Sequence, residues 1–150
     1  MQRTKELLTA TKATLVKLAA LVWFSGVVVL LFKSTVMLIE AVKIGAPVSV
    51  AVSAVIAGLI IGMIKAKYFF IRICKSNIKR IFALKSPKIW QFYRMRFFFF
   101  LFLMITLGNY SYSLFNNSVF LLVALSVLEL SISIALLISG KCFREILIRS

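Results

Sequence analysis

The sequence predicts an all-α integral membrane protein: a single domain over residues 1–150, built as a bundle of four transmembrane helices in two tandem hairpins. A basic amphipathic cytoplasmic helix is predicted between the second and third spans. Of the 150 residues, 62% are hydrophobic and the mean hydropathy is +1.03, more apolar surface than a soluble domain of this length could bury. Four apolar runs are long enough to cross a bilayer. Ten Lys and Arg, with no Asp or Glu, gather in residues 65–96.

The first span is predicted over about residues 15–32, after a basic amino-terminal segment. An uncleaved helix explains this run better than a signal peptide, because no small-residue cleavage site closely follows Phe32 and Lys33. The connection Lys33–Gly45 contains Glu40 and is too short to cross the membrane again. We expect it either to continue the helix or to lie at the membrane interface, on the outer side.

The second span is predicted over about residues 46–64, with Pro47 in its first turn, where a missing N–H costs nothing. Ala54, Gly58 and Gly62 recur every four residues and form a stripe of small side chains. Such a stripe lets another helix backbone approach closely. Packing of this stripe within the chain is preferred to packing against a second copy.

The basic stretch at residues 65–96 has helical periodicity in its first part. Over residues 66–84, cations fall on one side of a helix and apolar side chains mostly on the other. The helix is expected to end at Ser86-Pro87, and an aromatic group at residues 89–93 follows, as at membrane interfaces. The cationic side could bind anionic lipid headgroups or a cytoplasmic partner, or serve only to orient the chain. It consists of Lys65, Arg72, Lys75, Lys79 and Arg80.

The third and fourth spans are predicted over about residues 97–115 and 119–139, joined by an uncharged three-residue turn. Gly140 is a candidate C-cap for the last span. With both termini inside, 17 of the 19 cations lie on the inner side, and only Lys33 and Lys43 lie outside. The positive-inside rule therefore predicts cytoplasmic termini. The charge bias further favours a bacterial-type inner (cell) membrane.

Glu129 is the strongest candidate for a functional side chain. It lies ten residues from each end of the fourth span, about 15 Å along the helix and close to the bilayer midplane. Ser126 and Ser133 complete a polar stripe on this helix, and the hairpin geometry makes Thr106 a natural hydrogen-bond partner, with Asn109 one turn outward. Lys17 is a possible ionic partner. An ionisable residue at this depth suggests a proton or cation site, but a hydrogen-bonded residue that holds the bundle together is preferred.

The residue inventory argues against several classes of function. There is no His, and Cys74 and Cys142 do not form a CxxC pair, so we expect no metal site, no cofactor and two free thiols. No motif of a hydrolase, metalloprotease or phosphate-binding loop is present, so an enzyme is not predicted. Nucleic acid is an improbable partner, because the net charge of +15 sits beside apolar runs and follows no recognisable binding motif.

These observations favour a small, non-enzymatic, multi-pass membrane protein that acts through protein or lipid interaction, as an accessory or assembly subunit does. Its expected partners are the bilayer, anionic headgroups, and a membrane protein or a second copy of the chain. Two alternatives stay open. One is a small transporter or channel centred on Glu129. The other is an immunity-type protein that binds a pore-former within the membrane.

Overall fold

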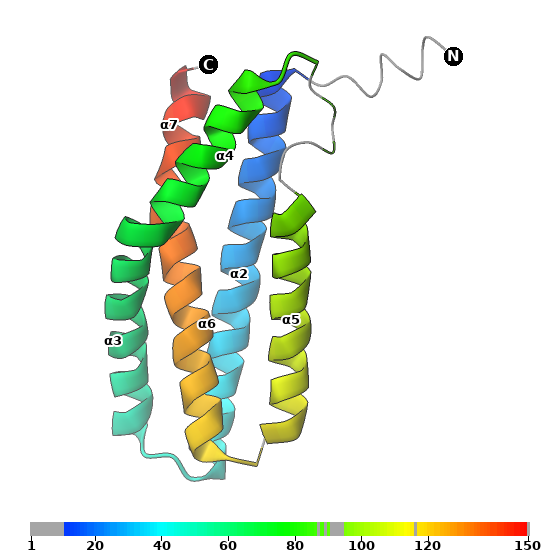
Figure 1. Ribbon diagram of the computed structural model, residues 1–150. Coiled ribbons are helices and arrows are strands. Elements are labelled where there is room, and N and C mark those ends of the chain that lie inside the picture. Colours follow the sequence, from blue (N-terminus) through cyan, green and yellow to red (C-terminus); the bar gives the residue numbers. More distant parts are fainter. Residues whose placement is uncertain (1–10, 87, 89, 91–94, 116, 150) are drawn as a thin grey trace.

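The computed structural model describes residues 11–86, 88, 90, 95–115 and 117–149. All the regular elements in these ranges are helical, which confirms the predicted all-α class. In chain order they are α2 (Lys12–Ile44), α3 (Val48–Lys65), the π-helical turn η1 (Ala66–Phe70), α4 (Ile71–Ala83), α5 (Met95–Phe115), α6 (Val119–Ser139) and α7 (Lys141–Arg149). Figure 1 shows α2, α3, α5 and α6 running side by side.

Within the described residues, three helical stretches are long and apolar enough to cross a membrane: Lys12–Ile44, Val48–Ala83 and Val119–Arg149. Such helices are compatible with a membrane protein. The helix α5 has 21 residues and is not one of the three, and several of its side chains lie outside the described part. The structure therefore supports three of the predicted spans, and it does not confirm the four-helix bundle.

The first helix is longer than the predicted span. α2 is a single helix of 33 residues, so the segment after Phe32 continues the helix, which was one of the two expectations. Thr11 caps its first turn by accepting a hydrogen bond from the Thr14 N–H. Gly45 ends it with a φ of 125°, a conformation that favours glycine. Lys33 consequently lies well inside a helix rather than in a connection.

The helix α6 lies between α2 and α3, and both pack mainly against α6 rather than against each other. Two buried hydrogen bonds join α2 to α6. The Trp23 indole donates to the Leu136 carbonyl at 2.8 Å, and the Ser133 hydroxyl donates to the Val27 carbonyl at 3.0 Å. The predicted tandem hairpins would pack α2 against α3 and α5 against α6, but each of these pairs makes few contacts.

The small-residue stripe of α3 faces α6. Ala54, Gly58 and Gly62 are all buried, and a Cβ on Gly62 would lie 2.8 Å from the Ser131 carbonyl oxygen. The stripe therefore allows the backbones of α3 and α6 to approach closely within one chain. Pro47 precedes α3 as its N-cap residue and is not in the first turn as predicted.

The chain leaves α3 through η1 and enters α4, which runs obliquely across the upper end of the molecule (Figure 1). The predicted amphipathic helix is present. Its apolar side, including Cys74, Ile78 and Ile81, is buried against α2 and α7. The Lys12 ammonium donates to the Phe82 carbonyl at 2.6 Å, which satisfies an acceptor at the end of α4. Of the aromatic group predicted at 89–93, only Trp90 lies within the described residues.

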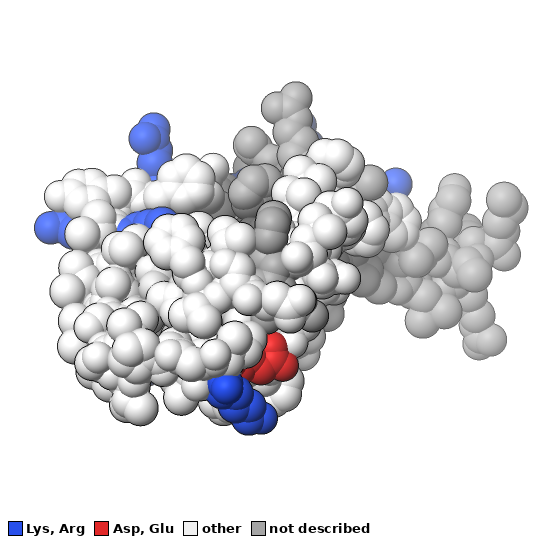
Figure 2. Space-filling model, turned by 90° about the horizontal axis from the view of Figure 1, so that it is seen from below, with Lys and Arg blue, Asp and Glu red and all other residues white. Residues whose placement is uncertain are grey.

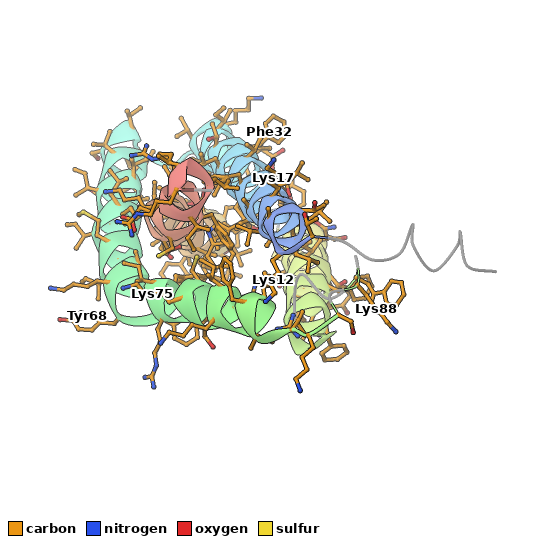
Figure 3. All side chains as sticks on the ribbon, turned by 90° about the horizontal axis from the view of Figure 1, so that it is seen from above. Lys12, Lys17, Phe32, Tyr68, Lys75 and Lys88 are labelled. Carbon is orange, nitrogen blue, oxygen red and sulfur yellow. The ribbon has the colours of Figure 1, made fainter. Side chains whose placement is uncertain are left out.

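The two ends of the molecule differ in charge. The start of α2, the whole of α4 and the end of α7 lie at one end, where Figure 3 shows Lys12, Lys17 and Lys75. The connections after α2 and α5 lie at the other end, and Figure 2 shows that this face is largely uncharged. Cys74 and Cys142 are free thiols beside each other in the core of the basic end.

Two glycine substitutions test the packing of α6. Gly62→Ala should lower the free energy of unfolding by roughly 1–3 kcal/mol, because the new methyl group would clash with a backbone carbonyl. Gly26→Ala is the matched control. Its Cβ would meet only the flexible end of Leu136, at 3.6 Å, and its helix propensity would improve. Unfolding by denaturing detergent measures both, and equal stability of the two variants would contradict this packing.

Candidate functional site

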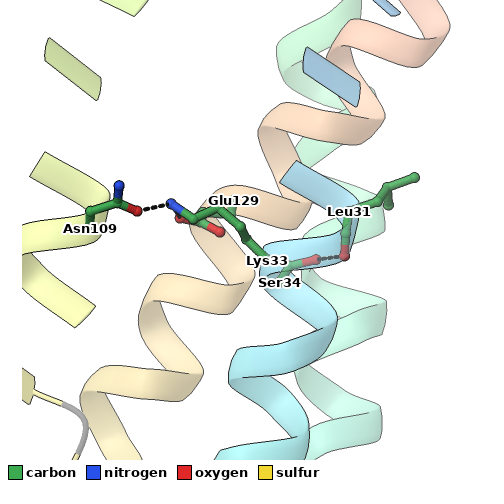
Figure 4. Close-up of polar contacts among 5 residues, drawn as sticks. All are labelled: Leu31, Lys33, Ser34, Asn109 and Glu129. Atoms are coloured by element: carbon green, nitrogen blue, oxygen red, sulfur yellow. Dashed lines mark hydrogen bonds and ion pairs between the residues drawn. The ribbon is translucent and has the colours of Figure 1, made fainter. Parts of the chain in front are cut away.

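Three polar side chains from three helices converge midway along the molecule (Figure 4). Lys33 comes from α2, Asn109 from α5 and Glu129 from α6. The Lys33 Nζ lies 3.8 Å from the Glu129 Oε1 and donates a hydrogen bond to the Asn109 Oδ1 at 2.7 Å. We call these three residues the polar cluster. The lysine is its centre, because it contacts both of the other side chains.

The level of the cluster follows from helix geometry. Lys33 lies eleven residues before the end of α2, and Glu129 lies ten residues after the start of α6. Both positions are about 15–17 Å from the same end of the molecule at 1.5 Å per residue. The long α2 therefore brings a cation level with Glu129.

Gly108 lets α5 approach the charged pair. A Cβ at this position would lie 3.2 Å from the Glu129 Oε1 and 3.6 Å from the Lys33 Nζ. The glycine thus presents open backbone to the ion pair while the next residue, Asn109, supplies the acceptor. A larger side chain at 108 would press directly on the carboxylate.

The two charged partners are unequally buried. The Glu129 side chain is 6% exposed and that of Lys33 is 25% exposed. Among the described residues, the buried Oε2 of Glu129 has no hydrogen-bond partner. The ion pair with Lys33 therefore leaves one oxygen of the carboxylate without a hydrogen-bond donor. Burying such an oxygen costs free energy.

A cavity of about 360 Å³ lies beside the cluster, between α2, α5 and α6. Glu129, Lys33 and Gly108 form part of its wall, and Ser25 and Ser111 also line it. Its other lining residues are apolar and come from all three helices. They are Val22, Gly26, Val29, Leu30, Leu103, Ile105, Leu107, Leu125 and Leu128.

A second polar contact fastens α5 to α2. The Tyr112 hydroxyl donates to the Glu40 Oε2, and together with Lys33–Asn109 it links the two helices at two levels. This matters because α5 packs only sparsely on α6. Among the described side chains, these two polar contacts join α5 to α2 beside the cavity.

The hydroxyls predicted to lie near Glu129 donate their hydrogen bonds to backbone carbonyls instead. Thr106 does not bond to the carboxylate as expected, because its hydroxyl donates to the Phe102 carbonyl of its own helix at 2.8 Å. Ser126 donates to the Val123 carbonyl at 2.7 Å, and Ser133 donates across to α2. Of the predicted neighbours, only Asn109 joins the cluster, and it does so through Lys33.

The ionic partner of Glu129 is Lys33 and not Lys17, which was considered as a possible partner although it was expected nearer the cytoplasmic boundary. Lys17 is exposed near the start of α2, sixteen residues and about 24 Å along the helix from Lys33. Lys33 was missed because the first span was ended at Phe32, which placed Lys33 on the outer side whether or not the helix continued. Counting residues back from the end of the continued helix at Ile44 would have placed Lys33 level with Glu129.

The predicted cationic side of the basic helix is only partly a surface. Arg72, Lys75 and Lys79 are exposed on α4. Lys65 is half-buried and donates to the Ser131 hydroxyl at 3.1 Å, while the Nε of Arg80 is buried. Further exposed cations lie on neighbouring elements at the same end. They are Lys17, Lys67, Lys85, Lys88, Lys141, Arg144 and Arg149.

Among the described residues, no group of three or more His, Cys, Asp or Glu is placed to hold a metal ion. The fold and the cluster define a helical protein with membrane-length apolar helices, a buried ion pair midway along them, and a basic end. Comparisons with protein families, with curated proteins and with solved structures found no match for this chain.

A double-mutant cycle tests whether Lys33 and Glu129 act as a pair. Lys33→Met should lower the free energy of unfolding by roughly 3–5 kcal/mol, because it leaves a buried carboxylate without its counter-ion. Adding Glu129→Leu should recover much of this loss. Lys43→Met, in the last turn of α2, is the control and should change stability by less than about 0.5 kcal/mol. Additive effects of the two substitutions would show that the side chains do not interact.

Proposed function

We propose that this chain is a non-enzymatic, multi-pass integral membrane protein that acts through interaction at its basic end, with anionic lipid headgroups as the ligand. The observation that carries this proposal is the arrangement of α4. Its apolar side is covered by α2 and α7, so that Arg72, Lys75 and Lys79 are held outward on a packed support. Cations near a membrane surface attract anionic lipids by about 1 kcal/mol each.

Aromatic side chains beside this end support a position at the headgroup level. Tyr68 and Phe69 in η1 are 72% and 58% exposed, next to the exposed Lys67. Trp90 is half exposed, with the Lys88 ammonium 5.4 Å from its ring centroid. Exposed aromatic side chains next to cations are typical of the boundary between hydrocarbon and headgroups.

The topology that accompanies this proposal has four spans, α2, α3, α5 and α6, in a cell (inner) membrane with both termini in the cytoplasm. Its support is the distribution of charge, since 17 of the 19 cations fall on the inner side in this orientation. The small size and the absence of catalytic motifs fit an accessory or assembly subunit.

The polar cluster favours a structural role for Glu129 over the transport alternative. The carboxylate already has an internal counter-ion at 3.8 Å, and a single paired acid is a poor carrier for protons or cations. The immunity-type alternative has no feature of the described residues in its favour. Lipid interaction is therefore the function that we put forward for testing.

Lipid selectivity of the reconstituted protein tests the proposal. Native mass spectrometry of the wild type should show retention of phosphatidylglycerol over phosphatidylcholine, falling as salt rises. The combined change of Arg72, Lys75 and Lys79 to Gln should reduce this preference by tenfold or more, because three cations are lost from the surface. Lys43→Gln, at the opposite end, should leave it intact.

Two outcomes would overturn the lipid assignment. The first is an equal preference for phosphatidylglycerol in the wild type and the triple variant. The second is a wild type without any preference. If lipid preference is absent while a protein partner is lost from native membranes only in the triple variant, then the basic end serves protein interaction.

A further inference from the structure

The two cysteines of the chain are distant in sequence and meet at the basic end of the molecule. Cys74 comes from α4 and Cys142 from the start of α7, and Figure 1 shows these two helices side by side. The Cys74 thiol lies beside the Cys142 side chain and the Phe143 backbone N–H. Both cysteines are free thiols. Because the sequence contains no other cysteine, a disulfide within one chain can join only these two.

Packing on both sides holds the two sulfur atoms in place. Cys74 is fully buried on the apolar side of α4. Phe143, the residue after Cys142, is also buried, with its ring centroid 5.5 Å from that of Trp23 on α2. Two groups held next to each other react as if each were present at very high concentration. A bond between the two sulfurs is therefore favoured over the capture of a second small molecule.

The two thiols differ in exposure, and this difference sets the order of any reaction with a solute. Cys74 is 0% exposed, whereas Cys142 is partly exposed. Thiol–disulfide exchange requires the attacking sulfur to reach the oxidant. Cys142 is consequently the sulfur that reacts first, and Cys74 is the resolving sulfur behind it.

The charges around the pair select the kind of oxidant. Within three residues of either cysteine the sequence has four cations and a single acid, Glu145, and all five side chains are exposed. A surface with this excess of positive charge attracts anionic solutes and repels cationic ones. The four cations are Arg72, Lys75, Lys141 and Arg144.

We propose that Cys74 and Cys142 form an oxidation site, at which an anionic small-molecule disulfide converts the dithiol into a reversible disulfide between α4 and α7. The Cys142 thiol gives its proton to water, and its sulfur attacks the oxidant, whose S–S bond breaks and releases one small thiolate. Cys74 then gives up its proton and attacks the Cys142 Sγ, which expels the second small thiolate. The two protein sulfurs are oxidised, and the oxidant is reduced to two thiols that take up the two protons.

Oxidation of the full-length protein in phosphatidylcholine nanodiscs tests this site. After treatment with dithiodiglycolate and blocking of free thiols with N-ethylmaleimide, mass spectrometry should find the Cys74 peptide joined to the Cys142 peptide within one chain. The unfolding midpoint in denaturing detergent should rise on oxidation and fall back on reduction, because the cross-link restricts the unfolded chain.

Two variants separate the roles of the sulfurs. Cys74→Ala should stop at a mixed disulfide on Cys142, formed at the rate of the first step in the wild type. Cys142→Ser should react more slowly by about tenfold or more, because its remaining thiol is buried. The unfolding transition of each variant checks its fold.

Salt dependence tests the charge of the oxidant. The rate of the first step should fall with rising salt for dithiodiglycolate and should rise for cystamine, which is cationic. Changing Lys75 and Lys141 together to Gln should weaken both trends. Lys43→Gln, at the opposite end, should leave them unchanged. The zwitterionic lipid keeps the membrane from adding a charge preference of its own.

Three results would overturn the proposal. A wild type that stops at a mixed disulfide, or forms disulfides only between chains, would show that the two thiols do not meet. Equal first-step rates in Cys74→Ala and Cys142→Ser would show that exposure does not set the order. The same salt dependence for dithiodiglycolate and cystamine would refute the preference for an anionic oxidant.

Discussion

Polar groups buried along α6 must find their partners inside the protein, and the arrangement of the other helices follows from this constraint. α6 has an uncharged, apolar sequence apart from Glu129 and its serines, and hydrocarbon offers these groups no hydrogen bonds. Three serines use carbonyls of their own helix, whereas Ser133 reaches α2. Glu129 instead pairs with a cation from another helix, and among the described residues this cation is Lys33, which the length of α2 brings to that level.

The same arrangement separates two environments along the molecule. At one end, α4 buries its apolar side on α2 and α7 and turns cations outward, which suits the headgroup layer. About half a bilayer thickness away, the charges are few, opposite and enclosed. α5 completes this inner site through Asn109 and Tyr112, and its loose fit against α6 leaves the cavity between them. α4 therefore carries the basic surface and α5 completes the inner site, while α2 contributes to both.

Much of the fold could be predicted because lipid-facing helices have a strong and local signature. The apolar runs predicted both bounds of α6 and predicted the bounds of α3 to within two residues. The periodic spacing of the cations predicted the position of α4. The site was harder to predict, because it depends on how helices distant in sequence pack together. Lys33 was placed outside the first span, since a charge at the edge of an apolar run normally ends a span. The role of α6 between α2 and α3 was missed because short connections favour sequential neighbours, whereas close approach at Gly58 and Gly62 decided the packing.

The central claim is that Lys33 and Glu129 meet inside the helical bundle. Solid-state NMR in lipid bilayers tests it most directly, by measuring the dipolar coupling between the Lys33 ¹⁵Nζ and the Glu129 ¹³Cδ in protein labelled at Lys and Glu. The separation of 3.8 Å between Nζ and Oε1 predicts a weak but measurable coupling, which Glu129→Gln labelled in the same way would remove. A wild type without this coupling, with Lys33 instead in contact with water or headgroups, would contradict the account.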